Sequence, residues 1–282
     1  MNTPKFQLGY STLPEGKEIV VKDAVYSNET QLERNLPHRH SFYVICLIRS
    51  GSGIHVIDFE EFEVRPNRLF IINPGQVHFW KIHSDTNISM VQFSESVPDL
   101  NSFLWIKRKY LDLAGKQCEA ILELSSKLKL ESDEKDSFSR NNIRSYLAIL
   151  CRTIARMSGN INNSVLNQKE DKLYKFSVLV DKYYIQQKSV RFYAGKLNIS
   201  ANYLNMLSGE ILGKNAGDII TQRTLLEAKR LLYHTNLDIN QVAFELGFDD
   251  PSYFTRFFRK HEKCTPSTFR EMIYKKYQYP NE

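Results

Sequence analysis

Apolar residues recur at two different spacings along this chain, and the spacing changes near residue 99. Before it, from Ile19 to about Phe93, short apolar runs are separated by turn signals, which is typical of the short strands of a small sandwich or barrel. After it, apolar residues recur every three or four positions, which predicts helices. The strands are expected at Phe42–Ile48, Ile54–Phe59, Phe62–Arg65 and Leu69–Ile72, with a turn at Glu60–Glu61 and a tight corner at Gly51–Gly53.

Two apolar stripes lie in the first helical segment. The second of these stripes has an alternating four-three spacing. Such a seam suits helix-on-helix association, either with neighbouring elements or with a second copy of the chain, and we favour a homodimer. A run rich in glycine, serine and asparagine follows at 158–164 and predicts an interdomain linker. The stripes are Cys118, Ile121, Leu122, Ser125 and Leu128, then Ile143, Leu147, Leu150, Ile154 and Met157.

The segment Asp238–Arg270 predicts a helix, a tight turn and two further helices. Asp238 is a good N-cap, and Gly247 ends the first helix because glycine enters the left-handed backbone region at little cost. Asp250 and Pro251 then form the cap-then-proline start of a second helix with a polar, basic outer face. Two helices joined by a glycine turn in this way are typical of a helix-turn-helix DNA reader. The side chains expected to face inward from the second helix are Tyr253, Phe254, Phe257 and Phe258.

An internal near-repeat predicts a second unit of the same kind upstream. Asn198 stands where the later copy has Gly247, and asparagine tolerates a left-handed turn. A helix is expected between the units, from about Asn215 to Thr235, and about 20 residues span roughly 30 Å, close to the ~34 Å repeat of the DNA major groove. Such a connector could hold two reading helices in successive grooves. The corresponding residues are Ala194, Leu197, Ser200, Tyr203 and Leu204 in the first copy and Ala243, Leu246, Asp250, Tyr253 and Phe254 in the second.

Charge and cysteine content narrow the class of protein. Residues 1–168 carry 20 Lys+Arg against 19 Asp+Glu, whereas the remainder carries 18 against 13, and this bias suits a polyanionic partner. The four cysteines include no CxxC pair, which argues against a disulfide framework and a zinc site. The longest apolar run, Phe42–Ile48, is far too short to span a membrane, and Met1–Tyr10 lacks the apolar core of a signal peptide. We therefore expect a cytoplasmic protein.

A more specific pattern lies within Asp238–Arg270. It consists of Ala243, Leu246, Gly247, Phe248, Asp249, Ser252, Tyr253, Phe254, Arg256, Phe258, Thr265, Pro266, Phe269 and Arg270. These residues closely resemble the signature of AraC-type bacterial transcription regulators. The resemblance implies a regulator rather than an enzyme, without a cofactor. The partners it implies are double-stranded promoter or operator DNA, RNA polymerase, a small-molecule effector and a second copy of the chain.

The resemblance also implies a two-domain α+β architecture. Residues 1–98 would form a cupin-like sensor barrel and residues 99–158 a helical dimerisation segment. Residues 159–168 would be a linker, and residues 169–282 an all-α DNA-binding domain with two helix-turn-helix units.

In each unit, exposed side chains early in the second helix are the expected readers of base edges, and basic groups further along are expected to meet phosphates. In the first unit the readers are Asn202, Asn205 and Met206; asparagine can pair with adenine, and methionine offers an apolar contact to a thymine methyl. In the second unit three residues match the family's base-facing positions, and the arginine is either a guanine reader or a phosphate contact. These three are Pro251, Ser252 and Arg256, and the predicted interface continues through Thr255, Arg259 and Lys260.

Histidines in the strand region form a second candidate site. His38, His40 and Pro74–His78, with the glycine corner, resemble the two motifs of a cupin barrel, whose metal-binding members hold a metal through three histidines and a carboxylate. Val44 stands in the carboxylate's place, so no metal is expected, although three imidazoles can suffice for zinc or iron. The alternatives are a structural role at a strand entrance and a turn, or a small-molecule pocket. His55 and His83 fit no pattern. The pocket would be lined by His38, His40, Val44, His78 and Trp80.

Three functions follow from these patterns. The favoured one is a sequence-specific transcription regulator whose barrel senses an effector. A metal-dependent cupin enzyme with a DNA-binding tail would instead hold metal through His38, His40 and His78. An architectural DNA binder without an effector would bind random and promoter DNA equally at physiological salt.

Overall fold

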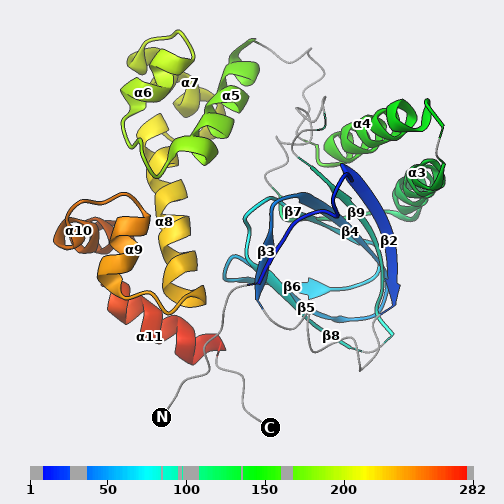
Figure 1. Ribbon diagram of the computed structural model, residues 1–282, viewed down its shortest axis with the longest axis horizontal. Coiled ribbons are helices and arrows are strands. Elements are labelled where there is room, and N and C mark those ends of the chain that lie inside the picture. The colour runs from blue at the N-terminus through cyan, green and yellow to red at the C-terminus, as the bar shows by residue number, and fades with distance from the viewer. Residues whose placement is uncertain are drawn as a thin grey trace. The chain divides into compact units, whose positions relative to one another are not determined.

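The computed structural model describes residues 9–25, 37–83, 85–94, 97, 108–134, 136–159 and 168–277. These residues form two compact units, one before and one after residue 164, and each is described by itself (Figure 1). The predicted boundary at residues 98 and 99 and the predicted linker from Asn160 onward lie outside the described residues. The two-domain fold class is confirmed, because the first unit is rich in strands and the second is helical.

Two five-stranded sheets make up most of the first unit. The strands of each sheet pair in antiparallel fashion, except that β1 runs parallel to β3. The first sheet has the order β1 (Gly9–Ser11), β3 (His38–His40), β8 (His78–Ile82), β5 (Gly53–Ile57) and β6 (Glu60–Val64). The second has the order β10 (Tyr110–Asp112), β7 (Arg68–Ile72), β4 (Tyr43–Ser50), β9 (Asn87–Phe93) and β2 (Ile19–Val25).

Strand β4 is buried on both faces, which explains why its sequence is continuously apolar. Val44 and Cys46 point into the space between the sheets, where they join an apolar cluster that includes Trp80 of the opposite sheet. Ile45 and Leu47 point outward and join a second cluster formed with two helices. Alternate residues of a strand point to opposite faces, so one short strand supplies both clusters.

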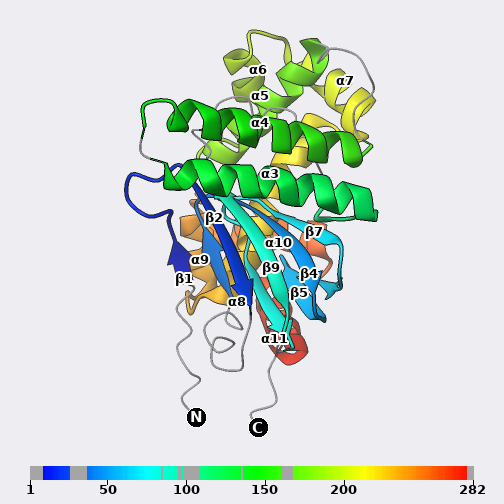
Figure 2. The ribbon, with the colours of Figure 1, turned by 90° about the vertical axis from the view of Figure 1, so that its right-hand side faces the viewer.

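The helices α3 (Gly115–Asp133) and α4 (Ser139–Met157) cover the outer face of the second sheet. Figure 2 shows α3 running across the ends of β2 and β9 with α4 beside it, and α3 contacts both strands and α4. Leu147, Leu150 and Ile154 are fully buried in the cluster that these helices share with the sheet. The seam that we interpreted as favouring a homodimer is therefore occupied within the chain, and the homodimer itself stays a prediction. An a/d spacing indicates that a helix packs on another helix, but it does not indicate whether that helix belongs to the same chain or to a second copy.

One predicted turn was misplaced by two residues. The connection between β5 and β6 is the two-residue turn Asp58–Phe59, and Glu60 and Glu61 already belong to the second strand. Both turn residues have positive φ, of 46° and 74°, as expected for a two-residue hairpin connection. Phenylalanine is disfavoured there, so the residue type gave no turn signal.

The predicted corner at Gly51–Gly53 is explained by crowding. A side chain on Gly53 would place its Cβ 2.3 Å from the main-chain oxygen of Lys81 on the neighbouring β8. The strand pairing that carries His55 therefore requires a glycine at this position.

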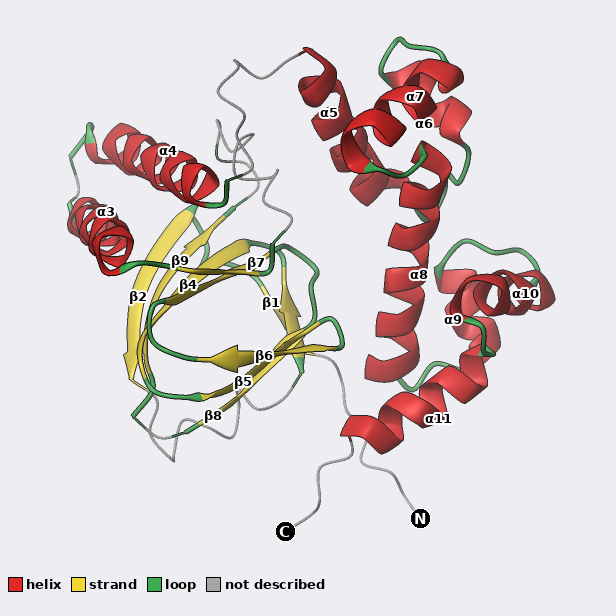
Figure 3. Cartoon of the chain, turned by 180° about the vertical axis from the view of Figure 1, so that it is seen from behind, coloured by secondary structure: helices red, strands yellow, loops and turns green. Residues whose placement is uncertain are grey.

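Seven helices make up the second unit within the described residues (Figure 3). The long helix α8 lies at its centre and contacts α5, α6, α7, α9 and α11, so both predicted helix-turn-helix pairs are mounted on it. The helices are α5 (Gln168–Tyr183), α6 (Val190–Lys196), α7 (Ala201–Leu212), α8 (Ala216–His234), α9 (Ile239–Glu245), α10 (Pro251–Glu262) and α11 (Pro266–Tyr277).

Helix α8 begins and ends close to the predicted residues. The side chain of Asn215 caps it by accepting from Asp218 N, and Thr235 closes it. Its 19 residues correspond to a length of about 28 Å. Arg270 of α11 donates to Leu232 O at 2.8 Å and Leu237 O at 2.6 Å, which fixes the last helix against the end of α8. No helix in the described ranges is long and apolar enough to cross a membrane.

The C-cap of α10 generates a testable prediction. Lys263 occupies a left-handed conformation, with φ of 63°, whereas the first unit has Gly213 at the corresponding cap with φ of 67°. Because a non-glycine residue there costs about 1 kcal/mol, we expect Lys263→Gly to raise the free energy of unfolding by about 0.5–1 kcal/mol.

Urea denaturation of the full chain measures this change. The matched control is Lys260→Gly, which makes the same substitution inside the helix and is expected to lower stability by about 1 kcal/mol. Equal effects of the two substitutions would contradict the interpretation of Lys263 as a strained cap.

Candidate functional site

Helices α9 and α10 form the better-defined helix-turn-helix unit. Asp238 caps α9 by accepting from Gln241 N at 2.8 Å, and the Gln241 side chain accepts from Asp238 N at 2.9 Å, which completes a capping box. Gly247 then takes a φ of 70° and turns the chain. Asp250 caps α10 by accepting from Ser252 N at 2.8 Å. Local hydrogen bonds therefore set where both helices begin.

The inner face of α10 holds the unit together. Phe254 and Phe258 are fully buried, and Phe258 contacts Phe269 of α11 edge-on with ring centroids 5.6 Å apart. Phe257 is only half-buried, and Tyr253, which we predicted to face inward, is 56% exposed. Tyr253 lies on the flank of the helix and contacts Phe248 with its ring at 5.9 Å, so its hydroxyl end remains in water.

The outer face of α10 is polar and basic, as predicted. Ser252, Arg256, Arg259 and Lys260 are exposed, while Pro251 and Thr255 are half-buried at the side of the helix. Arg256 approaches Asp250 at 3.6 Å, but both side chains are largely exposed. A solvent-exposed ion pair of this kind is worth little, so the guanidinium group can leave it for a phosphate or a base edge.

The first unit, α6 and α7, repeats this construction with different residues. Asn198 supplies the left-handed turn with φ of 54°, and Ser200 caps α7 by accepting from Tyr203 N at 3.1 Å. Asn202 and Met206 are exposed on α7, and Met206 is 53% accessible. An exposed methionine on a helix whose inner residues are fully buried is available for apolar contact.

Asn205 has a structural partner that the sequence did not reveal. Its side-chain oxygen accepts from Ala216 N at 3.1 Å, and Ala216 is the first residue of α8. The first backbone amides of a helix have no partner within the helix, so this bond anchors α7 to the start of the connector. Adenine pairing would have to use the remaining lone pair of the same oxygen.

Histidines from three adjacent strands gather inside the first unit. His38 of β3 lies opposite His78 of β8, with ring centroids 4.3 Å apart, and His40 lies 5.1 Å from His78. His55 of β5 joins them, because its Nε2 and His78 Nδ1 are 3.1 Å apart. Sequence reasoning had brought His38, His40 and His78 together but had missed His55, whose place depends on the pairing of β5 with β8.

Hydrogen bonds fix the loop that precedes β8 and so position His78 at the start of that strand. Asp58 accepts from Gln76 Nε2 at 2.8 Å and from Val77 N at 3.2 Å, and Gly75 N donates to His40 O at 2.8 Å. Trp80 stacks on His55 with ring centroids 3.4 Å apart. The predicted pocket residues Val44 and Trp80 belong to one interior apolar cluster that lies next to the histidines.

Burial favours the uncharged form of His40, His55 and His78. It lowers the pKa of His40 to about 4, and it lowers the pKa of His55 and His78 well below the ordinary value, with the neighbouring His38 acting in the same direction. His40 Nδ1 lies 2.6 Å from Phe42 O, and a carbonyl can only accept, so Nδ1 carries the proton and Nε2 keeps its lone pair. Within the described residues, no group of three or more His, Cys, Asp or Glu side chains is arranged to hold a metal ion.

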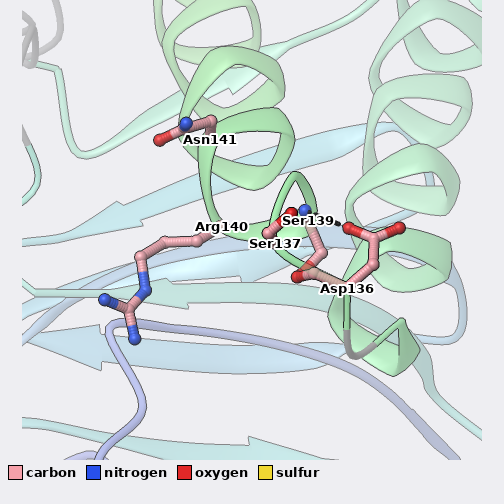
Figure 4. A pocket seen from close by; sticks show the side chains of 5 residues that line it. All are labelled: Asp136, Ser137, Ser139, Arg140 and Asn141. Atoms are coloured by element: carbon pink, nitrogen blue, oxygen red, sulfur yellow. Dashed lines mark hydrogen bonds between the residues drawn. The ribbon is translucent and has the colours of Figure 1, made fainter.

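A surface pocket of about 450 Å³ lies at the start of α4. Asp136 Oδ1 accepts from the backbone amides of Phe138 and Ser139, and Figure 4 shows Arg140 and Asn141 extending away from it. The carboxylate therefore serves as a cap for the helix, and the open depression brings no reactive groups together.

Two helix-turn-helix units on one connector, in a chain that also carries a strand-rich domain, define a DNA-binding transcription regulator with a sensor domain. Two family models match the chain: the AraC-like ligand binding domain over residues 24–104 and a helix-turn-helix domain over residues 193–272. The chain belongs to the AraC-type family of transcription regulators.

Curated relatives are transcriptional regulators as well. The transcriptional activator RhaS of Citrobacter koseri is 20% identical over 83% of this chain and 87% of its own length. The regulator YfiF of Bacillus subtilis is 23% identical over 84% of this chain and 79% of its own length.

Similar solved structures include the regulator ToxT and isolated DNA-binding domains. ToxT from Vibrio cholerae is 15% identical, covers 90% of this chain and 98% of its own, and has a TM-score of 0.43. The DNA-binding domain of AdpA in complex with a target DNA is 19% identical, covers 38% and 96%, and has a TM-score of 0.35.

The buried histidines predict a pH dependence of stability. Their folded pKa values lie below the unfolded value of about 6.5, so the unfolded chain binds more protons as the pH falls through that range. The free energy of unfolding of the strand-rich unit should therefore be highest above pH 7 and decline from about pH 6.5 toward pH 4, by up to about 1.4 kcal/mol per pH unit for each histidine.

Urea denaturation followed by fluorescence at pH 7.5, 6.5 and 5.5 tests this, since carboxylates titrate at lower pH. His40→Phe should reduce the slope, whereas His83→Gln at an exposed site should leave it unchanged. Identical slopes in all three proteins would rule out the neutral cluster.

Proposed function

We propose that this regulator binds two operator elements in successive major grooves, one through α7 and one through α10. The observation that carries the proposal is the mounting of two capped helix-turn-helix units on one helix, whose length of about 28 Å approaches the ~34 Å groove repeat. The readers in this proposal are Asn202 and Met206 on α7 and Pro251, Ser252 and Arg256 on α10, with Thr255, Arg259 and Lys260 at the rim or on phosphates.

The hydrogen bond from Ala216 N changes the part that Asn205 plays in this proposal. Asn205 keeps its amide NH₂ for a base or a phosphate, but a two-bond contact with adenine would have to share its oxygen with the start of α8. Its main contribution is to orient α7.

Arg256→Ala is the first test of base readout. If Arg256 pairs with guanine, the substitution should weaken binding to a selected operator by about 1–3 kcal/mol and leave binding to random DNA nearly unchanged. Electrophoretic mobility shifts at fixed physiological salt, with duplexes selected from a random pool by the wild-type protein, measure both affinities.

The matched control is Arg259→Ala, which also replaces an arginine of α10 with alanine and so removes the same charge from the same helix. A phosphate contact at Arg259 should weaken both kinds of DNA about equally. If Arg256→Ala also weakens both equally, Arg256 is a phosphate contact. Wild-type protein that binds random and selected DNA equally would instead support the architectural alternative.

The strand-rich unit is proposed to bind a small-molecule effector beside the histidine cluster. His40 Nε2, His55 Nδ1 and His78 Nε2 are buried without a hydrogen-bond partner among the described residues. An unpaired buried polar atom is costly, and a ligand that pairs it recovers that cost. Because His40 Nε2 presents a lone pair, the complementary ligand group is a hydroxyl or an N–H. The proposed contact residues are His38, His40, Val44, His78 and Trp80, to which His55 is now added.

A thermal-shift screen compares sugars, polyols and phenols with the corresponding carboxylic acids. A neutral hydroxyl compound at 100 times its Kd should add about 2.7 kcal/mol to the stability of the wild type. The same compound should stabilise His83→Gln fully and His40→Phe much less. Equal stabilisation of both variants would place the ligand elsewhere, and stabilisation by the acids alone would reject the neutral-ligand chemistry.

A separate experiment is metal analysis of protein purified without a histidine tag. Near-stoichiometric metal bound through His38, His40 and His78 would favour the metal-dependent cupin enzyme. Our proposal is that the chain is not an enzyme, and it is supported by relatives that are transcriptional regulators.

Homodimerisation and a contact with RNA polymerase also belong to the proposal. Since the α4 seam is buried within the chain, we propose that a second copy meets the outward sides of α3 and α4. Large apolar side chains are exposed there at Leu130, Phe138 and Ile149. RNA polymerase and cytoplasmic location follow from the proposed role as a regulator of promoters.

A further inference from the structure

The first and second reading units are linked at one backbone turn as well as through α8, by the segment that leads into the first unit. The loop after α5, which precedes the first unit, reaches the turn between α9 and α10 in the second. Ile185 and Lys188 belong to this loop, and Leu246, Gly247 and Phe248 form the turn. The contact joins segments about 60 residues apart in the chain.

The backbones of the two segments are in direct contact. A Cβ on Gly247 would lie 2.4 Å from Ile185 O, nearer than any side chain permits. Gly247 therefore serves two purposes: it takes the left-handed turn, and it lets the loop approach the end of α9. Asn198, at the corresponding turn of the first unit, has a side chain, so the turn alone does not demand glycine.

Lys188 closes this contact with its ammonium group. Lys188 Nζ donates to Ile185 O at 2.9 Å, to Leu246 O at 2.9 Å and, more weakly, to Gly247 O at 3.4 Å. It also lies 4.5 Å from the centre of the Phe248 ring. The carbonyls at the end of α9 lack partners within the helix, so a cation placed there is favourable. The residue remains exposed overall, and the partial burial of its amine lowers the pKa of Lys188.

These contacts constrain the direction of α10. Helix α10 begins three residues after Phe248, and Phe248 packs against Phe254 and Phe257 of that helix with ring centroids 5.3 and 5.2 Å apart. Lys188 therefore fixes the position of the turn, and the turn places Phe248 against the inner face of α10. On the other side, Lys188 is followed by Ser189, the N-cap of α6, which leads into α7.

We infer that Lys188 is a positioning residue that fixes the second reading helix relative to the first, and so sets the spacing between operator elements that the protein accepts. The inference rests on the proposed reading of DNA by both units. It differs from a phosphate contact, the ordinary role of an exposed lysine in such a domain, because the donors of Lys188 are already directed at main-chain oxygens.

DNA binding by the full chain separates these roles. The probes are a duplex selected by the wild type from a random pool, the same duplex with one or two base pairs inserted between its two elements, and duplexes that retain a single element. The variants are Lys188→Met and the control Lys182→Met, which removes the same charge from an exposed site on α5.

Lys188→Met should bind the selected duplex about tenfold more weakly than the wild type, because two linked modules lose their combined affinity when their geometry is no longer fixed. Its affinity for single-element duplexes should stay within about twofold, and its preference for the original spacing over the insertions should shrink. Lys182→Met should keep the wild-type preference. An equal loss on single-element and two-element duplexes, or an unchanged spacing preference, would overturn the inference.

A second measurement needs no DNA. Spin labels at Asn202 on α7 and Arg259 on α10, introduced as cysteines with Cys264→Ser, report the distance between the reading helices. The distribution should be narrow with Lys188 and broader in Lys188→Met; equal widths would overturn the inference even if the DNA result agreed. Should the wild type select no duplex, the proposed DNA reading fails, and the label distances still decide the role of Lys188. If Lys188→Met melts below the assay temperature, Lys188→Gln, which removes the charge but keeps an NH₂ group, replaces it.

Discussion

The C-terminal unit depends on the burial of one helix, α8. Its apolar residues Ile220, Leu225, Ala228 and Leu232 are buried among the surrounding helices, and each buried Leu or Ile contributes about 1.5–3 kcal/mol. The buried Arg230 is compensated by Glu227 at 3.2 Å, as a charge removed from water must be. The helices α6 and α9 have seven residues each, and neither would be stable alone. The reading helices therefore keep their places because α8 supplies a common core.

The sequence predicted the helical unit well because its signals are local. Capping residues lie next to the helices they start, as Asp238 and Asn215 do, and a left-handed turn needs a residue type that tolerates it. Local signals do not carry the partner of a side chain. Asn205 was predicted to read a base because its partner Ala216 lies eleven residues away, beyond the reach of a local pattern. Tyr253 was predicted to face inward because its contact with Phe248, at the side of the helix, is not evident from helical spacing.

The strand-rich unit was harder to predict for a related reason. Periodicity gave the strands, but strand order and register decide which residues meet. His55 enters the histidine cluster only because β5 lies beside β8, and nothing in the neighbourhood of residue 55 reports that pairing. The α4 seam was ambiguous in the same way, because its spacing fits α3 and the sheet as well as a second chain. Asp58–Phe59 was missed because a phenylalanine occupies a conformation it seldom adopts.

Strand β4 is a wall that two hydrophobic cores share. Val44 faces the core between the sheets, and its chain neighbour Ile45 faces the core beneath α3 and α4. Close-packed interiors transmit strain rather than absorb it. A molecule bound in the space between the sheets would therefore be separated from α3 and α4 by a single layer of backbone.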